Sequence, residues 1–190
     1  MRRLLAKYSV LQGILEDNSN RMEIVCVRTG KRDNWFYVKR DDGSELSWPW
    51  PDEGLRLPHD FIHALVERHF GIADAFWDRV NAGAEIRSLH DQSRAGHQPV
   101  RYERPGIRLA EALVGTLSTA ETAGWTDKQC LEETRPCIDG LPQPENLSEA
   151  SLGEIRAEID AWTARWRALR PKESVRMDWS LSRGATSGPR

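Results

Sequence analysis

The chain has 190 residues, of which 39% are hydrophobic and 29% are charged, and its formal net charge is −2. This composition is typical of a globular protein with one main domain, and the small net charge argues against nucleic acid as a partner. No apolar run reaches the roughly 18 residues that a membrane span requires, so we expect no membrane partner. Three widely spaced cysteines, at 26, 130 and 137, favour reduced thiols and a cytoplasmic location over a disulfide framework.

The first elements expected along the chain form an antiparallel meander. Residues 1–21 are expected to be an N-terminal appendage, and they lack the continuous apolar stretch of a secretory signal. Apolar, β-branched and aromatic residues predict three strands, at 22–28, 34–40 and 45–48. The second and third strands flank a turn sequence that contains Gly43, which can adopt the positive φ of a hairpin. We expect the two prolines at 49 and 51 to end the sheet.

Amphipathic spacing and capping signals predict helices over much of the remaining chain. The predicted helices cover 58–70, a segment from Asp74 as N-cap to near Gly83, 107–120, a short segment from Asp127, and 148–169. Pro58 suits the first position of the first of these helices, and Gly71 suits the left-handed residue after its last turn. In the last helix, apolar residues spaced 3-4-3-4-3 form one seam, and Ser151 with Glu154 fits a capping box.

The end of the chain predicts one further strand. At 175–181, valine, methionine, tryptophan and leucine alternate with polar residues, which is typical of a half-buried strand. We expect this strand to join the N-terminal sheet. The predicted fold is therefore α+β, with a small antiparallel sheet (N-terminal meander plus C-terminal strand) packed by several helices. It forms a single domain at 22–183, followed by a disordered tail at 184–190.

The predicted helix at 58–70 gathers ionisable side chains at helical spacing. His59, His63 and Glu67 are each one turn apart and share a face, and Asp60 adjoins the first of them. This face could hold a divalent transition-metal ion, or it could be the polar side of an ordinary amphipathic helix. His59 and Glu67 are roughly 12 Å apart along the axis of a straight helix, so one ion cannot bind all three side chains. The ion would bind either His59 with His63, or His63 with Glu67.

Two interpretations of this helix remain open. A metal ion needs ligands from elsewhere in the chain, and the candidates are His90, Asp91 and His97 in the predicted long loop at 87–104. Without a metal ion, His63 would lie between carboxylates three residues before it and four residues after it. These carboxylates would favour the imidazolium form and raise the pKa of His63.

Two resemblances bear on the same helix. The sequence His59-Asp-Phe-Ile-His63 resembles the HExxH signature of the zincin metalloproteases, with aspartate in place of glutamate. This five-residue resemblance implies that the two histidines bind zinc and that Asp60 is the general base, although aspartate is one methylene shorter. The longer pattern LPHDxxHxxVE, from Leu57 to Glu67, is similar to a group of small uncharacterised bacterial proteins, which implies a bacterial, cytoplasmic setting but no activity.

Other features suggest a protein partner. The chain is rich in tryptophan, with eight residues, and Trp48 and Trp50 could form an aromatic contact surface. The stretch 87–108 contains five arginines and could bind a phosphate group or an acidic partner. The first function hypothesis is therefore a small interaction or regulatory module. The second is a metal-binding protein, as one possibility a metal-dependent hydrolase, centred on His59 and His63.

Overall fold

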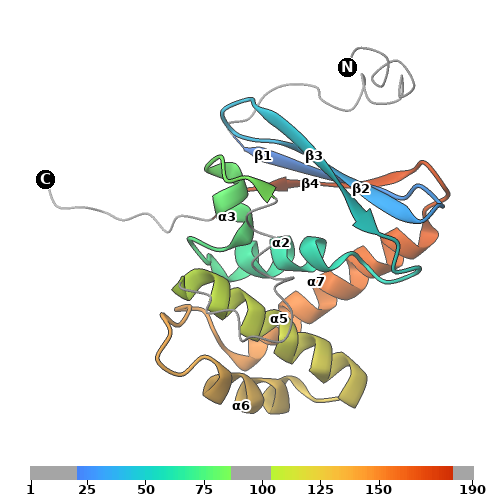
Figure 1. The fold of residues 1–190 in the computed structure, drawn as a ribbon. Coiled ribbons are helices and arrows are strands. Elements are labelled where there is room, and N and C mark those ends of the chain that lie inside the picture. The colour runs from blue at the N-terminus through green and yellow to red at the C-terminus, as the bar shows by residue number, and fades with distance from the viewer. Residues whose placement is uncertain (1–20, 87–103, 182–190) are drawn as a thin grey trace, which may run out of the picture.

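The computed structural model of the chain describes residues 21–86 and 104–181, and these residues form an α+β structure (Figure 1). Its sheet has four antiparallel strands, which in spatial order are β3 (Glu45–Pro51), β2 (Asp33–Lys39), β1 (Met22–Val27) and β4 (Ser174–Trp179). The predicted α+β class is confirmed, as are the N-terminal meander and the pairing of the C-terminal strand with β1. Of the predicted appendage, all but residue 21 lies outside the described residues, as does the whole predicted tail at 184–190.

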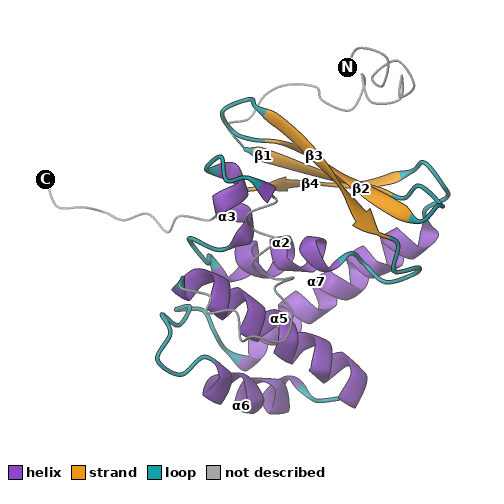
Figure 2. Ribbon diagram, in the orientation of Figure 1, coloured by secondary structure: helices purple, strands orange, loops and turns teal. Residues whose placement is uncertain are grey.

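The helices lie below the sheet in the view of Figure 2, on one of its faces. They are α2 (His59–Phe70), α3 (Phe76–Asn81), α5 (Pro105–Ala123), α6 (Asp127–Cys137) and α7 (Glu149–Ala168). Among the described residues, no helix is both long enough and apolar enough to cross a membrane.

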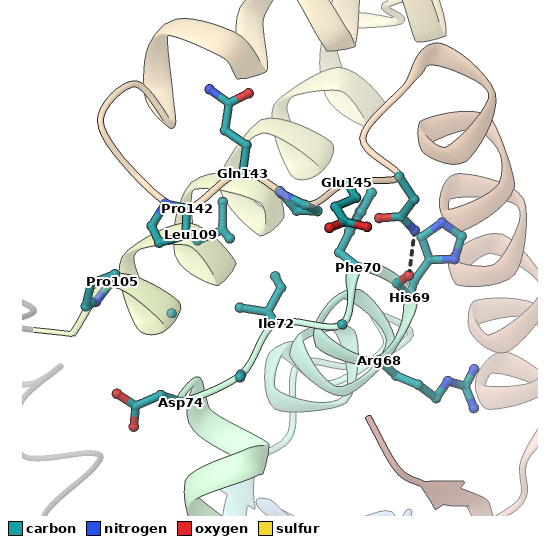
Figure 3. Close-up of a pocket in the computed structure, with 15 residues that line it drawn as sticks. Arg68, His69, Phe70, Ile72, Asp74, Pro105, Leu109, Pro142, Gln143 and Glu145 are labelled. Atoms are coloured by element: carbon teal, nitrogen blue, oxygen red, sulfur yellow. Dashed lines mark hydrogen bonds between the residues drawn. The ribbon is translucent and has the colours of Figure 1, made fainter. Parts of the chain in front are cut away.

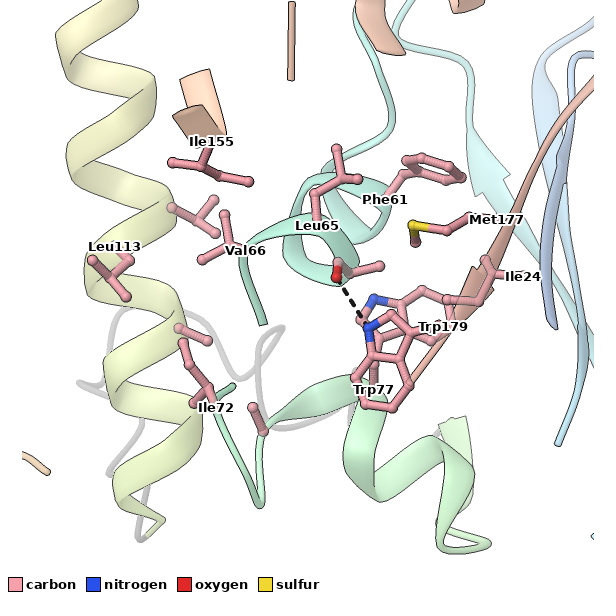
Figure 4. Packing of buried hydrophobic residues seen from close by; sticks show 14 of the residues in the cluster. Ile24, Phe61, Leu65, Val66, Ile72, Trp77, Leu113, Ile155, Met177 and Trp179 are labelled. Atoms are coloured by element: carbon pink, nitrogen blue, oxygen red, sulfur yellow. Dashed lines mark hydrogen bonds between the residues drawn. The ribbon is translucent and has the colours of Figure 1, made fainter. Parts of the chain in front are cut away.

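Helix α2 lies at the centre of the hydrophobic core (Figure 4). On one side, Phe61 of α2 packs with Ile24 and Met177, which come from the inner face of the sheet. On the other side lie Leu113 of α5 and Ile155 of α7, and all five side chains are at most 3% exposed. Burial of a large apolar side chain contributes roughly 1.5–3 kcal/mol, so these contacts hold α2 firmly between the sheet and the other helices.

Two buried tryptophans fix the position of α2 through its backbone. The indole Nε1 of Trp77 donates to the backbone oxygen of Asp60 at 2.7 Å, and that of Trp179 donates to the backbone oxygen of Ala64 at 3.0 Å. Both rings are at most 1% exposed, and an indole N–H buried without an acceptor would be costly. The two bonds therefore determine where the side chains in the first half of α2 lie.

The prediction that the Trp-Pro segment ends the sheet is wrong. This segment forms the second half of β3, where Pro49 pairs with Trp35 and Pro51 pairs with Asp33. β3 is an edge strand, and an edge strand tolerates proline where the missing N–H would point away from its neighbour. The prolines therefore leave the sheet intact and restrict further pairing at its edge.

The starts of α2 and α3 differ slightly from the predictions. Pro58 is the N-cap of α2 rather than its first residue, whereas Gly71 has the predicted left-handed conformation, with φ of 63°. The N-cap of α3 is Ala75 rather than Asp74. The Asp74 carboxylate instead accepts hydrogen bonds from Arg104 at 2.9 and 3.0 Å, which draws it toward the start of α5.

Helix α7 has the predicted seam but a different cap. Its capping box is formed by Ser148 and Ser151, not by Ser151 and Glu154, because the helix already begins after Ser148. The seam side chains are unequally covered: Leu152, Ile155 and Trp166 are buried, whereas Ile159, Trp162 and Leu169 are half-buried.

Candidate metal centre

The two histidines predicted to act together do meet at the start of α2. The helix begins at His59, and the four-residue spacing puts His63 directly above it on the same face. Their Nε2 atoms lie 3.1 Å apart. His63 is only 5% exposed, whereas His59 is exposed to solvent. The pair thus has one end in the core and one end at the surface.

A carboxylate from a second helix completes this cluster. Oε2 of Glu111 on α5 lies 3.7 Å from Nε2 of His63. The ligand atoms of His59, His63 and Glu111 all lie within 4.8 Å of one another. Neighbouring ligands of a tetrahedral zinc ion, bound at about 2.0–2.1 Å, are roughly 3.3 Å apart. The separations of 3.1 and 3.7 Å lie on either side of that value, so the cluster is close to the geometry that an ion needs.

The second nitrogen of His63 faces a buried carboxylate. Nδ1 of His63 lies 3.7 Å from Oε1 of Glu67, which is fully buried. The other oxygen of Glu67 accepts a hydrogen bond from the backbone N–H of Trp77 at 2.8 Å. Histidines that bind metal usually donate their second N–H to a carboxylate or carbonyl group, which fixes the ring and its tautomer. Glu67 is placed to do this for His63.

The pKa values of the two histidines shift in opposite directions. Burial by itself would lower the pKa of His63, but its neighbours Glu67 and Glu111 raise it overall. Although His59 is exposed as a residue, partial desolvation of its imidazole by the surrounding protein, together with the charge of His63, lowers its pKa. For Glu67, burial raises the pKa, and the hydrogen bond and charge of His63 offset only part of this increase. His63 and Glu67 therefore retain a proton more readily than free side chains, whereas His59 favours the neutral form that binds metal.

Of the two predicted ligand pairs, the structure brings His59 and His63 together around a common point. Glu67 is outside that cluster and faces the opposite nitrogen of His63. Asp60, the predicted general base, is 6% exposed, and its charge acts on both histidines. Burial raises the pKa of the Cys26 thiol in β1, and the charge of Asp60 adds to this increase. Asp60 therefore lies near the sheet side of α2, and its role as a base stays a prediction.

The third member of the cluster was not predicted. The candidates His90, Asp91 and His97 all lie outside the described residues. Glu111 was missed because no spacing in the sequence connects it with α2. One signal was available: Glu111 is the only acidic residue in the predicted helix at 107–120, which is otherwise almost uncharged.

The tryptophans proposed as a contact surface are mostly covered. Trp48 is 6% exposed and stacks on Phe36 with ring centroids 5.2 Å apart. Trp50 is half-buried and meets the same phenylalanine ring edge-on. Trp48 is thus part of the core, and its ring is not available to a partner.

A hollow of about 760 Å³ lies elsewhere on α2 and does not include the cluster (Figure 3). It is formed where the end of α2 approaches the start of α5 and the loop at 142–146. Phe70, Ile72 and Leu109 contribute apolar walls, and Arg68 and Asp74 lie at its rim. Because neither His59, His63 nor Glu111 lines it, the hollow and the cluster are separate features.

Comparison with protein-family models, with curated proteins and with solved structures found no match. The resemblances to zincins and to small bacterial proteins therefore stay predictions.

Proposed function

We propose that this protein binds one divalent transition-metal ion through Nε2 of His59, Nε2 of His63 and the carboxylate of Glu111. The observation that carries the proposal is the convergence of three ligand atoms from two helices within 4.8 Å of one another. Two imidazoles and one carboxylate form a ligand set common to zinc sites and to non-haem iron sites.

The contacts within the cluster favour an ion over a purely structural role. Two imidazole nitrogens 3.1 Å apart can share only one proton, because a proton on each would place two N–H groups against each other. A metal ion instead accepts the lone pairs of both nitrogens at once. The buried carboxylate of Glu67, 3.7 Å from Nδ1 of His63, favours a proton on that nitrogen and so leaves Nε2 free for the ion.

Hydrolysis by a metal-bound water is the reaction class that we attach to this site. Catalytic zinc sites commonly use three protein ligands and leave a fourth position for water, whose pKa the ion lowers toward neutrality. The zincin-like order of His59, Asp60 and His63 supports the same class, with Asp60 as the proposed base. The three free cysteines agree with the bacterial cytoplasmic setting that we propose for it.

The interaction or regulatory module stays a prediction. One of its proposed surfaces contains Trp48, which is buried, and most of the arginine-rich stretch at 87–108 lies outside the described residues. The metal site is the better supported hypothesis because its contacts are within the described residues.

Metal analysis of protein purified without a histidine tag and without chelator tests the proposal. We expect near-stoichiometric zinc, iron or manganese, or uptake of one equivalent of added zinc. His63→Ala should abolish this uptake. His69→Ala is the matched control, because His69 is on the same helix but outside the cluster, and it should bind metal like the wild type. Wild-type protein that takes up no added zinc would contradict the proposal.

A further inference from the structure

The two edges of the sheet differ in their capacity to pair with a further strand. β3 forms one edge and β4 forms the other, and among the described residues no strand pairs with the outer side of either. The β3 edge contains Pro49 and Pro51, which lack the N–H groups that a new neighbour would need. β4 contains no proline over its six residues. Of the two edges, β4 is therefore the one that can accept another strand.

The backbone of β4 directs every second residue toward this outer side. In an antiparallel ladder, opposed residues alternate between pairs that exchange hydrogen bonds and pairs that do not. The N–H of Arg28, just after β1, donates to the backbone oxygen of Glu173, just before β4, at 2.9 Å. Counting in steps of two from this bonded pair, Arg176 and Asp178 fall on the pairs that are not bonded to β1. Their N–H and C=O groups therefore point outward.

The side chains of β4 alternate with the same period. Val175, Met177 and Trp179 face the helices and are at most 5% exposed. Arg176 and Asp178 lie on the opposite face of the sheet and are exposed. The strand thus has an apolar side, which a second apolar strand could extend, and a charged side with one arginine and one aspartate.

Within one copy of the chain, Asp178 lies beside a like charge. It is directly opposite Glu23 of β1, and like charges in this position are destabilising. Burial is the main reason why the pKa of the Glu23 carboxyl is raised, and the charge of Asp178 adds to the increase. Arg176 forms its ion pair with Glu23. A further positive charge beside Asp178 would therefore be stabilising.

A second copy of β4 can supply that charge in one register. Three antiparallel registers bring outward residues near the centre of the strand into opposed pairs: Arg176 with Arg176 of the partner subunit, Asp178 with Asp178 of the partner subunit, or Arg176 with Asp178 of the partner subunit. The first two oppose like charges, whereas the third forms two arginine–aspartate pairs by symmetry. The third register also places Val175 opposite Trp179 of the partner subunit and the two Met177 side chains opposite each other, which continues the apolar side.

We propose that this protein forms a symmetric dimer in which β4 pairs antiparallel with β4 of a second copy, and Arg176 lies opposite Asp178 of the partner subunit. The two four-stranded sheets then become one continuous sheet, with the helices of both copies on the same face. The prolines of β3 lie at both outer edges of this sheet, so the assembly closes at two copies. The dimer does not depend on the proposed metal site.

Sedimentation velocity of the full chain tests this dimer, with a chelator present so that no metal ion can link two copies. We expect a monomer–dimer equilibrium that shifts toward the dimer as the protein concentration rises. Arg176→Glu opposes two acidic side chains and Asp178→Arg opposes two arginines, so each should raise the dissociation constant of the dimer by about tenfold or more. The double variant with both substitutions pairs opposite charges again and should restore dimerisation.

Two further variants separate the β4 edge from other surfaces. Glu45→Arg reverses an exposed charge on β3 and should leave the dimer unchanged. Asp178→Pro removes an outward N–H but no hydrogen bond to β1, so it should abolish the dimer and leave the fold intact. Circular dichroism of each variant shows that its fold is retained.

The outcomes that contradict the proposal are distinct. A wild type that stays monomeric at every concentration would overturn the dimer. A dimer that persists in Asp178→Pro would use another surface, which would overturn the role of β4. A dimer that is lost in Asp178→Pro but unaffected by both charge reversals, or that the double variant fails to restore, would overturn the register.

Discussion

The ionisable side chains around α2 differ sharply between the buried end of the cluster and its open end. At the buried end, His63 and Glu67 are at most 5% exposed, and Glu67 is held by the backbone of Trp77. At the open end, His59 is exposed and Glu111 is half-buried. In the proposed metal site, this difference would divide the roles: the buried pair would fix one ligand in place, and the open pair would leave room for an ion.

The largest expected effect is the loss of stability when Glu67 is removed. Glu67→Ala leaves the N–H of Trp77 and Nδ1 of His63 buried without their partner, so we expect the free energy of unfolding to fall by about 3 kcal/mol. Urea denaturation of the metal-free protein measures this effect. If Glu67→Ala lowered the free energy of unfolding no more than a surface substitution does, Glu67 would not be holding His63 and Trp77 in place.

Removing Glu111 should produce the opposite pattern. Glu111→Gln takes away a proposed direct ligand, so zinc affinity should fall by about 100-fold or more, beyond the roughly 10–100-fold typical of a residue that contacts a ligand but not the ion. The free energy of unfolding should change by less than about 1 kcal/mol, because this carboxylate is partly exposed. Calorimetric titration with zinc gives the affinity, and Glu121→Gln on the same helix is the matched control. Equal zinc binding by both variants would remove Glu111 from the site.

The metal-free protein should lose stability as the pH rises above 6.5. The pKa of His63 is raised from its ordinary value of 6.5, so the folded state holds a proton that the unfolded state has released. This contribution is complete below the unfolded pKa and disappears as the pH passes through the folded pKa. The pKa of His59 is lowered from 6.5, so its titration falls below this window.

Urea denaturation at several pH values from 6.5 upward measures this dependence. Because the interaction of the His63 imidazole with the Glu67 carboxylate is the largest cause that raises the pKa of His63, Glu67→Gln should make the slope shallower. A wild-type stability that rises over the same window would contradict the assigned charge states of the buried pair.

The smallest expected effects concern two glycines of α5. Gly115→Ala should raise the free energy of unfolding by up to about 1 kcal/mol, since alanine favours a helix and no atom of the described residues outside the helix backbone lies within 4 Å of the added Cβ. Gly106→Ala should lower it, because the new Cβ would collide with the backbone oxygen of Ala73. Thermal denaturation of both variants tests the pair. A destabilised Gly115→Ala would show that a Cβ at position 115 meets other parts of the protein.

Local patterns predicted much of the fold. The alternation after 174 predicted β4, whose Val175, Met177 and Trp179 face the core, and Gly71 predicted the end of α2. These features depend on neighbouring residues alone. The extension of β3 through Pro49 was missed because proline is tolerated only at an edge, and the position of a strand in its sheet is not a local property.

The candidate site was predictable only in part, for the same reason. His59 and His63 are paired by helical spacing, which the sequence shows directly. Glu111 joins them through the packing of α5 on α2, across 48 positions of the chain, and only the three-dimensional structure reveals this contact. Helical spacing alone made Glu67 a possible ligand. In the structure, Glu67 instead accepts a hydrogen bond from the backbone of Trp77 and faces Nδ1 of His63, the nitrogen that points away from the cluster.

The most direct test of the metal site is a crystal structure of the zinc-loaded protein with diffraction data collected at the zinc absorption edge. The proposal predicts one strong anomalous peak about 2 Å from Nε2 of His59, Nε2 of His63 and an oxygen of Glu111. A map with no peak between these three side chains, from protein saturated with zinc, would contradict it.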